Sequence, residues 1–278
     1  MTIFCELLTE RFANFAKATC LMMISIYPTG LLAQTPYTMC SADHCQTVTT
    51  SLMTLSGPLP STVRTVCKAQ DAYALTFDDG PSANWYEVLS ILERHQIPAS
   101  FFVIGDKLHS ETGQQAIRDA WLQGHQISNH SYSHPDLLQL AAADIVWQIQ
   151  TTEHLIIEAL GRLPQVMRDA RIMRPPYGYI DQRVEDLIVA NQYTSVFWNS
   201  DRKDWALSEG ESHIVIERLE QHIAYIEAQD LVGLNTSIID LNHDFLLASL
   251  KVLDELIGKV KAAGYRFVTV SECLGLDD

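Results

Sequence analysis

Positive charge is scarce in this chain. It carries 19 lysine and arginine residues against 34 aspartate and glutamate residues, which gives a formal net charge of -15. No patch of basic residues interrupts this acidic excess. We therefore expect no nucleic-acid partner, because phosphate binding needs such patches. The acidity suits a neutral or cationic partner instead.

A long unbroken apolar run is also missing. The most apolar stretch, residues 18–32, is interrupted by polar residues, proline and glycine, so we expect no stable membrane span. It follows Arg11 and Lys17 and precedes the small residue Ala33, a pattern that predicts a secretion signal over residues 1–33. An uncleaved N-terminal helix or a wrong start codon is the alternative. No C-terminal anchor signal is apparent, and we expect a secreted protein, either extracellular or in the cell wall.

Cysteine pairs of the C-x-x-C type are absent, which argues against a cysteine-bound metal. Beyond residue 33 the cysteines are Cys40, Cys45, Cys67 and Cys273. An even number is what an oxidising compartment favours. A Cys67–Cys273 bridge would join the ends of a domain and leave Cys40 and Cys45 to close a small loop. Reduced, buried thiols are the alternative.

The chain of 278 residues is long enough for one sizeable α/β domain or two small ones. Residues 34–66 lack periodicity and are interpreted as an irregular N-terminal extension. From residue 67 to about 275, strand and helix patterns alternate. The expected strands are Tyr73–Phe77, Ser100–Ile104, Ile172–Arg174, Ser195–Trp198, Ser237–Leu241 and Tyr265–Val270. The expected helices are Trp85–His95, Gln114–Gln123, Ala141–Leu160, Asp181–Asn191, Ser212–Ala228 and Phe245–Ala263. Such alternation predicts a parallel sheet or barrel.

Two adjacent carboxylates, Asp78 and Asp79, end the first expected strand. A turn explains Asp79 and the Gly-Pro that follows, but two neighbouring carboxylates repel each other unless a cation or shared proton relieves them. His130 and His134 are four residues apart, a spacing at which two imidazoles can bind one ion. A solvated loop is the alternative for this pair. With Asp79 they would form a two-imidazole, one-carboxylate site for a divalent metal.

Three further segments follow expected strands. Arg174 precedes a Pro-Pro-Tyr-Gly turn and could hold a carboxylate, or it could be a surface arginine. Residues 201–205, Asp-Arg-Lys-Asp-Trp, could be an exposed charged loop, although an exposed tryptophan beside carboxylates is typical of sugar sites. His243 could be an ordinary strand-end histidine, but its usual pKa suits proton donation near neutral pH. These residues gather at the carboxyl ends of strands, where barrel active sites form.

Taken together, the segments resemble the polysaccharide deacetylase family, also called the NodB-homology or carbohydrate esterase family 4 domain, and more narrowly its fungal chitin deacetylases. Five family motifs can be placed in order, over residues from about 67 to 274. They are Thr-Phe-Asp-Asp-Gly at 76–80, His-Ser-Tyr-Ser-His at 130–134, Arg-Pro-Pro-Tyr-Gly at 174–178, Asp-Arg-Lys-Asp-Trp at 201–205 and Leu-Asn-His at 241–243.

The resemblance implies a distorted (β/α) barrel of the NodB-homology type and a set of residue roles. Asp78 would be the catalytic base, oriented by Arg174. Asp79, His130 and His134 would bind Zn²⁺ or another divalent ion such as Co²⁺. The remaining roles are implied as follows: His243 as general acid, Asp204 as its partner, the Tyr177 backbone N–H in the oxyanion hole, and Trp205 and Leu241 in the substrate pocket. The Cys67–Cys273 bridge also fits the fungal pattern.

The activity implied is metal-dependent removal of N-acetyl groups from chitin or chito-oligosaccharides by a monomer. An O-acetyl esterase acting on xylan, or a catalytically impaired carbohydrate-binding member, is the alternative. A peptidoglycan deacetylase fits the fungal resemblance less well. The departure from the family lies directly before Arg174, where the Met-Arg pair at 167–168 recurs at 173–174. Residues 168–173 are therefore interpreted either as a gene-model artefact or as an insertion that bulges from the start of the strand. If such an insertion displaced Arg174, Asp78 would lose its anchor and activity would fall.

Overall fold

The computed structural model describes residues 37–41, 44–48, 59–230 and 236–276. The chain divides into two compact units, Met1–Thr54 and Leu55–Asp278. In the first unit, β1 (Tyr37–Ser41) pairs antiparallel with β2 (His44–Val48). This hairpin corrects the expectation that residues 34–66 are irregular throughout. The predicted secretion signal at residues 1–33 and the side chains of Cys40 and Cys45 lie outside the described residues.

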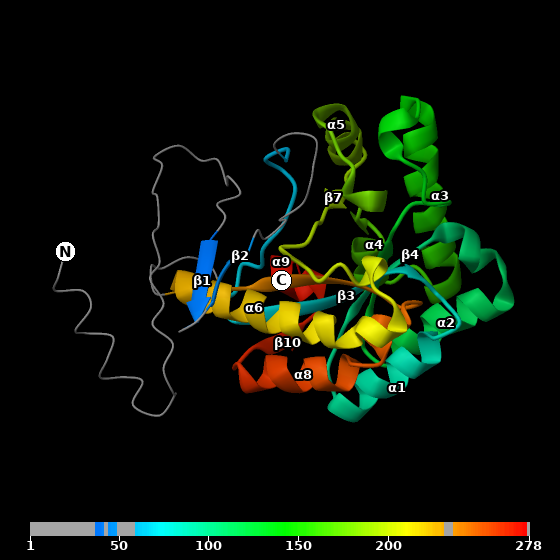
Figure 1. The fold of residues 1–278 in the computed structure, drawn as a ribbon. Coiled ribbons are helices and arrows are strands. Elements are labelled where there is room, and N and C mark those ends of the chain that lie inside the picture. Colours follow the sequence, from blue (N-terminus) through cyan, green and yellow to red (C-terminus); the bar gives the residue numbers. More distant parts are fainter. Residues whose placement is uncertain (1–36, 42–43, 49–58, 231–235, 277–278) are drawn as a thin grey trace. The chain divides into compact units, whose positions relative to one another are not determined.

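The second unit is built on a parallel sheet whose hydrogen-bonded order is β7-β6-β5-β4-β3-β9-β8, with β10 added at the start of β3 (Figure 1). The strands are β3 (Ala72–Gly80), β4 (Ser100–Val103), β5 (Gln126–Asn129), β6 (Ile172–Met173), β7 (Thr194–Ser195), β8 (Ser200–Asp201), β9 (Ile238–His243) and β10 (Arg266–Val268). Helices surround this sheet, so the expected distorted (β/α) barrel is confirmed.

Helices connect the strands as the alternation of patterns predicted. They are α1 (Trp85–His95), α2 (Glu111–Leu122), α3 (Ala142–Leu160), α4 (Pro164–Asp169), α5 (Gln182–Ala190), α6 (Ser212–Asp230), α7 (Leu247–Leu250), α8 (Leu253–Ala262) and α9 (Val270–Leu274). Short 3-10 turns are η1 (Gly105–His109), η2 (Leu137–Gln139), η3 (Pro176–Gly178), η4 (Asp204–Ala206) and η5 (Glu209–Glu211). The predicted helix Phe245–Ala263 is in fact two helices, α7 and α8.

Strand β3 lies between β4 and β9 in the middle of the sheet, and almost all of its residues are buried. Such strands appear in a sequence as continuous apolar runs, which is why β3 was predictable. Phe77 stacks on Phe101 of β4 with ring centroids 5.3 Å apart, and Trp85 of α1 lies 4.4 Å from the same ring. Complete burial of each such side chain contributes about 1.5–3 kcal/mol. This aromatic packing fixes β3, and with it the position of Asp78.

Strand β5 was not predicted because its sequence, Gln-Ile-Ser-Asn, is largely polar. All four residues are nevertheless buried, and hydrogen bonds satisfy the three polar side chains. Gln126 accepts a hydrogen bond from the Ser271 N–H, and Asn129 donates one to the Ile149 carbonyl. Buried polar groups satisfied in this way cost little. Apolar periodicity therefore could not predict that β5 is buried.

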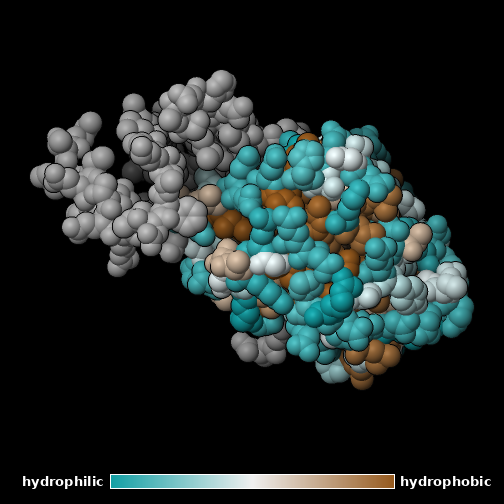
Figure 2. All heavy atoms as spheres, turned by 60° about the horizontal axis from the view of Figure 1, so that its bottom comes forward, coloured by the Kyte–Doolittle hydropathy of each residue, from teal (hydrophilic) through white to brown (hydrophobic). Residues whose placement is uncertain are grey.

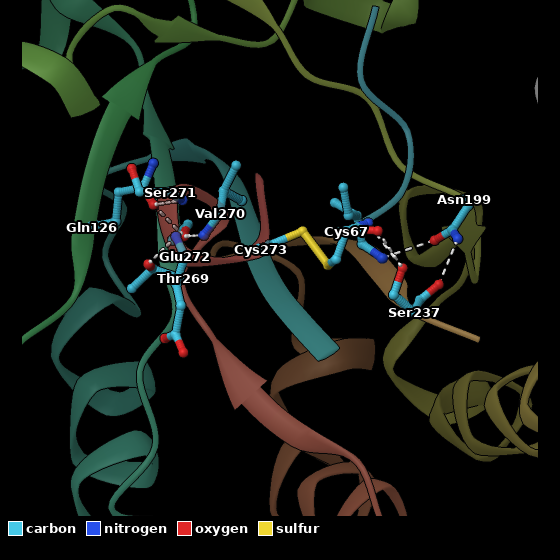
Figure 3. Close-up of a disulfide and its surroundings, with 11 residues drawn as sticks. Cys67, Gln126, Asn199, Ser237, Thr269, Val270, Ser271, Glu272 and Cys273 are labelled. Atoms are coloured by element: carbon cyan, nitrogen blue, oxygen red, sulfur yellow. Dashed lines mark hydrogen bonds between the residues drawn. A yellow bond between two sulfur atoms is a disulfide. The ribbon is translucent and has the colours of Figure 1, made fainter. Parts of the chain in front are cut away.

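A disulfide joins Cys67, just before β3, to Cys273 in α9 (Figure 3). The two cysteines are 206 residues apart in sequence. Neighbouring backbone reinforces the closure, since the Cys67 N–H donates to Ser237 Oγ and the Lys68 N–H donates to the Cys273 carbonyl. A cross-link over so long a loop restricts the unfolded chain and stabilises the fold by about 2–5 kcal/mol.

Residues 168–173 do not form the expected bulge, so that hypothesis is wrong. They contain the end of α4 and all of β6, and β6 pairs with β5 on one side and β7 on the other. Asp169 is 2% exposed and accepts a hydrogen bond from Ser271 Oγ. The segment is an integral part of the sheet and its packing.

The described residues include no helix that is both long and apolar enough to cross a bilayer. On the face shown in Figure 2, hydrophobic side chains are exposed in small groups among hydrophilic ones. A mixture of this kind is normal for a folded domain in water.

Candidate active site

The predicted site residues come together at the carboxyl ends of the central strands. Asp78 of β3 and His243 of β9 are partners in the register of this parallel pair. Asp201 at the end of β8 is in turn paired with Leu241 of β9. The carboxyl ends of β3, β9 and β8 are thus neighbours, and three of the predicted motifs meet there.

Backbone conformation is unusual at these motifs. Among the described residues, eight non-glycine residues have positive φ, and five of them lie in four of the five motifs. These five are Asp79, Ser131, His134, Tyr177 and Lys203. Such conformations cost free energy and tend to cluster at functional sites.

The carboxylate of Asp79 lies between two imidazoles. Its Oδ1 is 3.3 Å from Nε2 of His130 and 3.2 Å from Nε2 of His134. Asp79 Oδ1 is buried without a hydrogen-bond partner. Within the described residues this is the one group of three or more potential ligands whose ligand atoms all lie within 4.8 Å of one another. A buried, unpaired carboxylate oxygen facing two imidazole nitrogens fits a divalent cation with open positions for water.

The tautomer of His130 follows from its surroundings. Its Nδ1 lies 2.7 Å from the carbonyl oxygen of Arg174. A carbonyl can only accept, so Nδ1 carries a proton, and Nε2 is the nitrogen that faces Asp79 and could bind a metal. This arrangement, in which the far nitrogen is held by the protein, is typical of metal-binding histidines.

Electrostatics in this group are consistent with a shared cation. Burial raises the pKa of Asp79, but the nearby imidazoles of His130 and His134 outweigh it and leave the pKa well below its usual range. Burial, together with the charge of His130, lowers the pKa of His134 to about 4. An ionised Asp79 beside a neutral His134 is the protonation state that metal binding requires. Burial lowers the pKa of His130, but Asp78 and Asp79 outweigh it and raise the pKa, so metal binding there would displace a proton from Nε2.

The loop that carries the two histidines is held by a residue that the sequence did not identify. Gln148 of α3 accepts hydrogen bonds at its Oε1 from the backbone N–H groups of Tyr132 and Ser133, both at 2.9 Å. The His134 N–H donates to Ser131 Oγ. Lys107 was also missed, and its Nζ donates to the Asp79 carbonyl at 2.6 Å. Neither residue belongs to a motif, so only the fold associates them with the site.

Asp78 is fixed by Arg174. Arg174 Nη1 donates to Asp78 Oδ1 and to Thr76 Oγ1, both at 2.7 Å. The guanidinium is fully buried and lies 4.1 Å from the ring centroid of Phe102 and 5.4 Å from that of Trp198. Charge-assisted hydrogen bonds and stacking on aromatic rings hold the arginine rigidly. Arg174 is therefore not displaced by residues 168–173.

Asp204 and His243 form a second pair. Asp204 Oδ1 lies 2.9 Å from His243 Nδ1, and Asp204 Oδ2 accepts from the His243 backbone N–H at 3.0 Å. Burial lowers the pKa of His243, but the hydrogen bond and charge of Asp204, with Asp78 and Asp79, outweigh it and raise the pKa to about 9. The alternative of an ordinary strand-end histidine is thereby disfavoured.

The three residues predicted to bind substrate occupy different environments. Tyr177 is 57% exposed, and its ring contacts that of His134 with centroids 4.4 Å apart. Trp205 is also 57% exposed and directly follows Asp204. Leu241 is buried in β9, paired in register with Thr76, so its place in a substrate pocket stays a prediction.

Two other polar residues near the motifs have structural roles. His125 is buried and its Nδ1 accepts from the Ala99 N–H, away from the metal ligands. Asn129 starts a glycosylation sequon, but its side chain is buried and hydrogen-bonded to Ile149 and Ser131. A second sequon begins at Asn235, which lies outside the described residues.

Comparison with known proteins identifies relatives of this chain. The family model described as polysaccharide deacetylase matches residues 65–196. A chitin deacetylase from Colletotrichum lindemuthianum is 31% identical over 214 residues, covering 75% of this chain and 82% of the relative. The structure of the chitin deacetylase from that fungus superimposes with a TM-score of 0.67 at 30% identity, covering 78% of this chain and 93% of the other.

A bacterial relative is equally similar. The peptidoglycan-N-acetylglucosamine deacetylase of Listeria monocytogenes is 30% identical over 222 residues, covering 78% of this chain but 42% of the relative. The chain thus spans less than half the length of that protein. A bifunctional xylanase/deacetylase of Pseudobutyrivibrio xylanivorans is 32% identical over 205 residues, which are 73% of this chain and 30% of the relative.

Proposed function

The chain belongs to the polysaccharide deacetylase family, and from this membership we propose that it is a metal-dependent hydrolase that removes N-acetyl groups from chitin or chito-oligosaccharides. One observation above all supports the proposal. Asp79 faces His130 and His134 next to Asp78, and Asp78 is the register partner of His243. A ligand group, a base and an acid are thus placed side by side, as metal-assisted amide hydrolysis needs.

Asp79, His130 and His134 are the residues that would hold the metal. When bound there, a divalent ion would supply Lewis acidity toward the amide carbonyl and a water activated at neutral pH. Two imidazoles and one carboxylate suit Zn²⁺, with Co²⁺ as an alternative.

Asp78 is proposed as the base that takes a proton from the attacking water. Its Oδ1 is engaged by Arg174, so its orientation is set before substrate binds. Its Oδ2 lies 3.8 Å from Nε2 of His130, on the side of the proposed metal ligands. A base held in this way needs no reorganisation during the reaction.

His243 is proposed as the acid that protonates the departing amine. The amine cannot leave as an anion, so a group that is protonated at neutral pH is required. The Asp204 carboxylate keeps the imidazole of His243 protonated and oriented. The backbone N–H of Tyr177 would donate to the developing oxyanion. The products are acetate and a glucosamine unit.

Exposed aromatic rings at the site and the substrates of the relatives both bear on the substrate class. Tyr177 and Trp205, each 57% exposed, belong to motifs that contribute proposed catalytic residues, and sugars stack on such rings. Chitin and its oligomers are the substrate class that we propose. Peptidoglycan N-acetylglucosamine is the second candidate, favoured by the equal similarity of the Listeria relative. Xylan O-acetyl groups are a third, favoured by the xylanase/deacetylase relative.

A catalytically impaired carbohydrate-binding protein would be expected to lack a base or a ligand. Asp78, Asp79, His130 and His134 are all present and close together. We also propose that the protein is secreted, because the Cys67–Cys273 disulfide is typical of an oxidising compartment. We propose in addition that the catalytic domain spans residues 67–275 and that the protein is a monomer.

The test is acetate release from chito-oligosaccharides, peptidoglycan fragments and acetylated xylan by the metal-loaded protein, with and without a chelator. Acetate from chito-oligosaccharides alone, lost under chelation and restored by Zn²⁺ or Co²⁺, would support the proposal. Release from peptidoglycan or xylan alone would move the assignment to that substrate. Metal binding without release from any of the three would favour the carbohydrate-binding alternative.

A further inference from the structure

We propose that Arg202 is a positioning residue for the Asp204–His243 pair, acting through a buried ion pair with Asp240 that locks the loop carrying Asp204 onto the strand carrying His243. The effect on turnover rests on the proposed function, whereas the geometry of the pair does not. Arg202 lies in the motif at residues 201–205, in which the family specifies Asp201, Asp204 and Trp205 but not the two residues between the aspartates. The resemblance therefore implies no role for Arg202.

The burial of Arg202 is unexpected for its sequence context. It lies in the run Asp201-Arg202-Lys203-Asp204, which has the composition of an exposed charged loop. Arg202 is nevertheless only 1% exposed and is among the largest fully buried side chains of the described residues. An arginine is buried to this degree only when specific partners satisfy it.

Those partners are all on or beside the strand that ends in His243. Arg202 Nη1 donates to Asp240 Oδ1, and Nη2 donates to Asn242 Oδ1. Asp240 and Asn242 alternate along β9 with Leu241 and His243, so the guanidinium spans one face of this strand. Two hydrogen bonds from a planar guanidinium fix orientation as well as distance.

The partners of Arg202 are themselves fixed. Tyr73 Oη donates to Asp240 Oδ2 at 2.5 Å, and Asn242 Nδ2 donates to the Thr76 carbonyl at 3.2 Å. Both contacts reach β3, the strand that carries Asp78. The guanidinium of Arg202 is therefore held by β9 and β3, the two strands that carry the proposed acid and base.

The backbone of the loop is held from the other side. Arg218 of α6 donates from Nη1 to the Arg202 carbonyl, and the Lys203 N–H donates to Asp201 Oδ1 at 2.7 Å. Lys203 adopts a left-handed conformation, with φ of 52°, and Asp204 follows directly. With Arg202 anchored and Lys203 turning the chain, the Asp204 carboxylate lies against the backbone N–H and the ring Nδ1 of His243.

If the Arg202–Asp240 ion pair only stabilised the fold, its replacement would affect stability alone. If it also positions Asp204, its replacement would lower turnover even where stability is kept. Replacing both members of a buried pair by apolar residues of similar volume often leaves stability unchanged or raises it, whereas removing one member is strongly destabilising. An apolar pair cannot reproduce the fixed orientation of two hydrogen bonds. Stability and turnover can therefore be separated by comparing single and double variants.

The experiment compares Arg202→Met, Asp240→Leu and the double variant. We expect each single variant to unfold at lower temperature and the double variant to recover most of the loss. In the double variant kcat for a chito-oligosaccharide should still be about tenfold lower at unchanged KM, since a small misplacement of a proton donor is costly. The control is Lys259→Met with Glu220→Leu, an exposed pair between α8 and α6 that should leave kcat unaffected. A double variant with wild-type kcat would overturn the proposal.

Arg202→Lys keeps the charge but loses the planar fork, and it serves where the double variant fails to fold. Its readout is the nuclear magnetic resonance signal of the His243 Nδ1 proton, identified by its loss in Asp204→Asn. We expect this signal to weaken or move in Arg202→Lys and to stay unchanged in the Lys259–Glu220 control. An unchanged signal would overturn the proposal. This measurement needs no turnover, so an inactive wild type would count against the proposed function alone.

Discussion

Asp78 and His243 are register partners on the neighbouring parallel strands β3 and β9. The proposed base and acid, far apart in sequence, are thus held by the hydrogen bonds of the central strand pair and not by flexible loops. Arg174 fixes one of them and Asp204 fixes the other, each through a charge-assisted hydrogen bond shorter than 3 Å. A site with this support is expected to be preorganised before substrate arrives.

Replacing Asp78 by asparagine should abolish most activity while leaving metal binding intact. Asparagine keeps the shape but cannot accept the proton, and loss of a general base typically lowers kcat by about 10²–10⁴-fold. Acetate release and metal stoichiometry should be measured on the same sample. Asp186→Asn, a change at an exposed carboxylate of α5 hydrogen-bonded to Gln182, is the matched control. Full activity in Asp78→Asn would contradict the assignment of the base.

Removing either imidazole ligand should release the metal. His130→Ala and His134→Ala each leave two of the three ligands, and we expect stoichiometric Zn²⁺ or Co²⁺ in the wild-type protein to fall well below one equivalent. His125→Ala provides the control, because that buried histidine contacts the Ala99 backbone instead. Elemental analysis after gel filtration gives the measurement, and retention of a full equivalent in both variants would place the metal elsewhere.

The pH dependence of activity should report the Asp204–His243 pair. Burial lowers the pKa of His243, but Asp204, Asp78 and Asp79 together raise it to about 9. Since the raised pKa keeps the imidazole protonated, the acid is available through neutral pH and is lost as the pH rises through that value. Asp204→Asn should shift the alkaline limb of kcat/KM to lower pH by about one unit or more. An alkaline limb at the same pH in both proteins would disconnect His243 from it.

Loss of the disulfide should lower stability without changing the site. Cys67→Ser with Cys273→Ser removes a cross-link between residues 206 apart, and we expect a cost of about 2–5 kcal/mol in the free energy of unfolding. Thermal unfolding with and without reductant is the measurement. Reductant should destabilise the wild type and have no further effect on the double variant. Equal stability of the two oxidised proteins would mean that the bridge contributes nothing.

Deletion of residues 168–173 should prevent folding. The deletion removes β6, which pairs with both β5 and β7, together with the buried Asp169. Asp169→Ala is the milder variant and leaves Ser271 without its acceptor, which should cost about 1–3 kcal/mol. Soluble yield measures whether the deletion variant folds, and thermal unfolding measures the stability of Asp169→Ala. A deletion variant that is folded and fully active would revive the idea of a dispensable insertion.

Much of the fold could be predicted from local patterns. The helix Trp85–His95 was predicted to the residue, and the apolar core of β3 was placed within a few residues. Prediction failed at β5, whose burial depends on hydrogen bonds of polar side chains with α9 and α3. It failed again at residues 168–173, where a bulge that displaces Arg174 was expected, whereas the segment forms the end of α4 and β6 and Arg174 contacts Asp78.

By itself the sequence determined which residues could perform chemistry, because the residue types and their places after apolar runs are local properties. Only the tertiary structure decided which of them meet. Asp79 faces His130 and His134, Asp78 faces Arg174, and Asp204 faces His243. It also decided that Arg202, in a stretch that could have been a solvated loop, is buried against Asp240. The reason is physical: periodicity records whether a side chain faces the core, whereas ion pairs and strand register depend on segments that are distant in sequence.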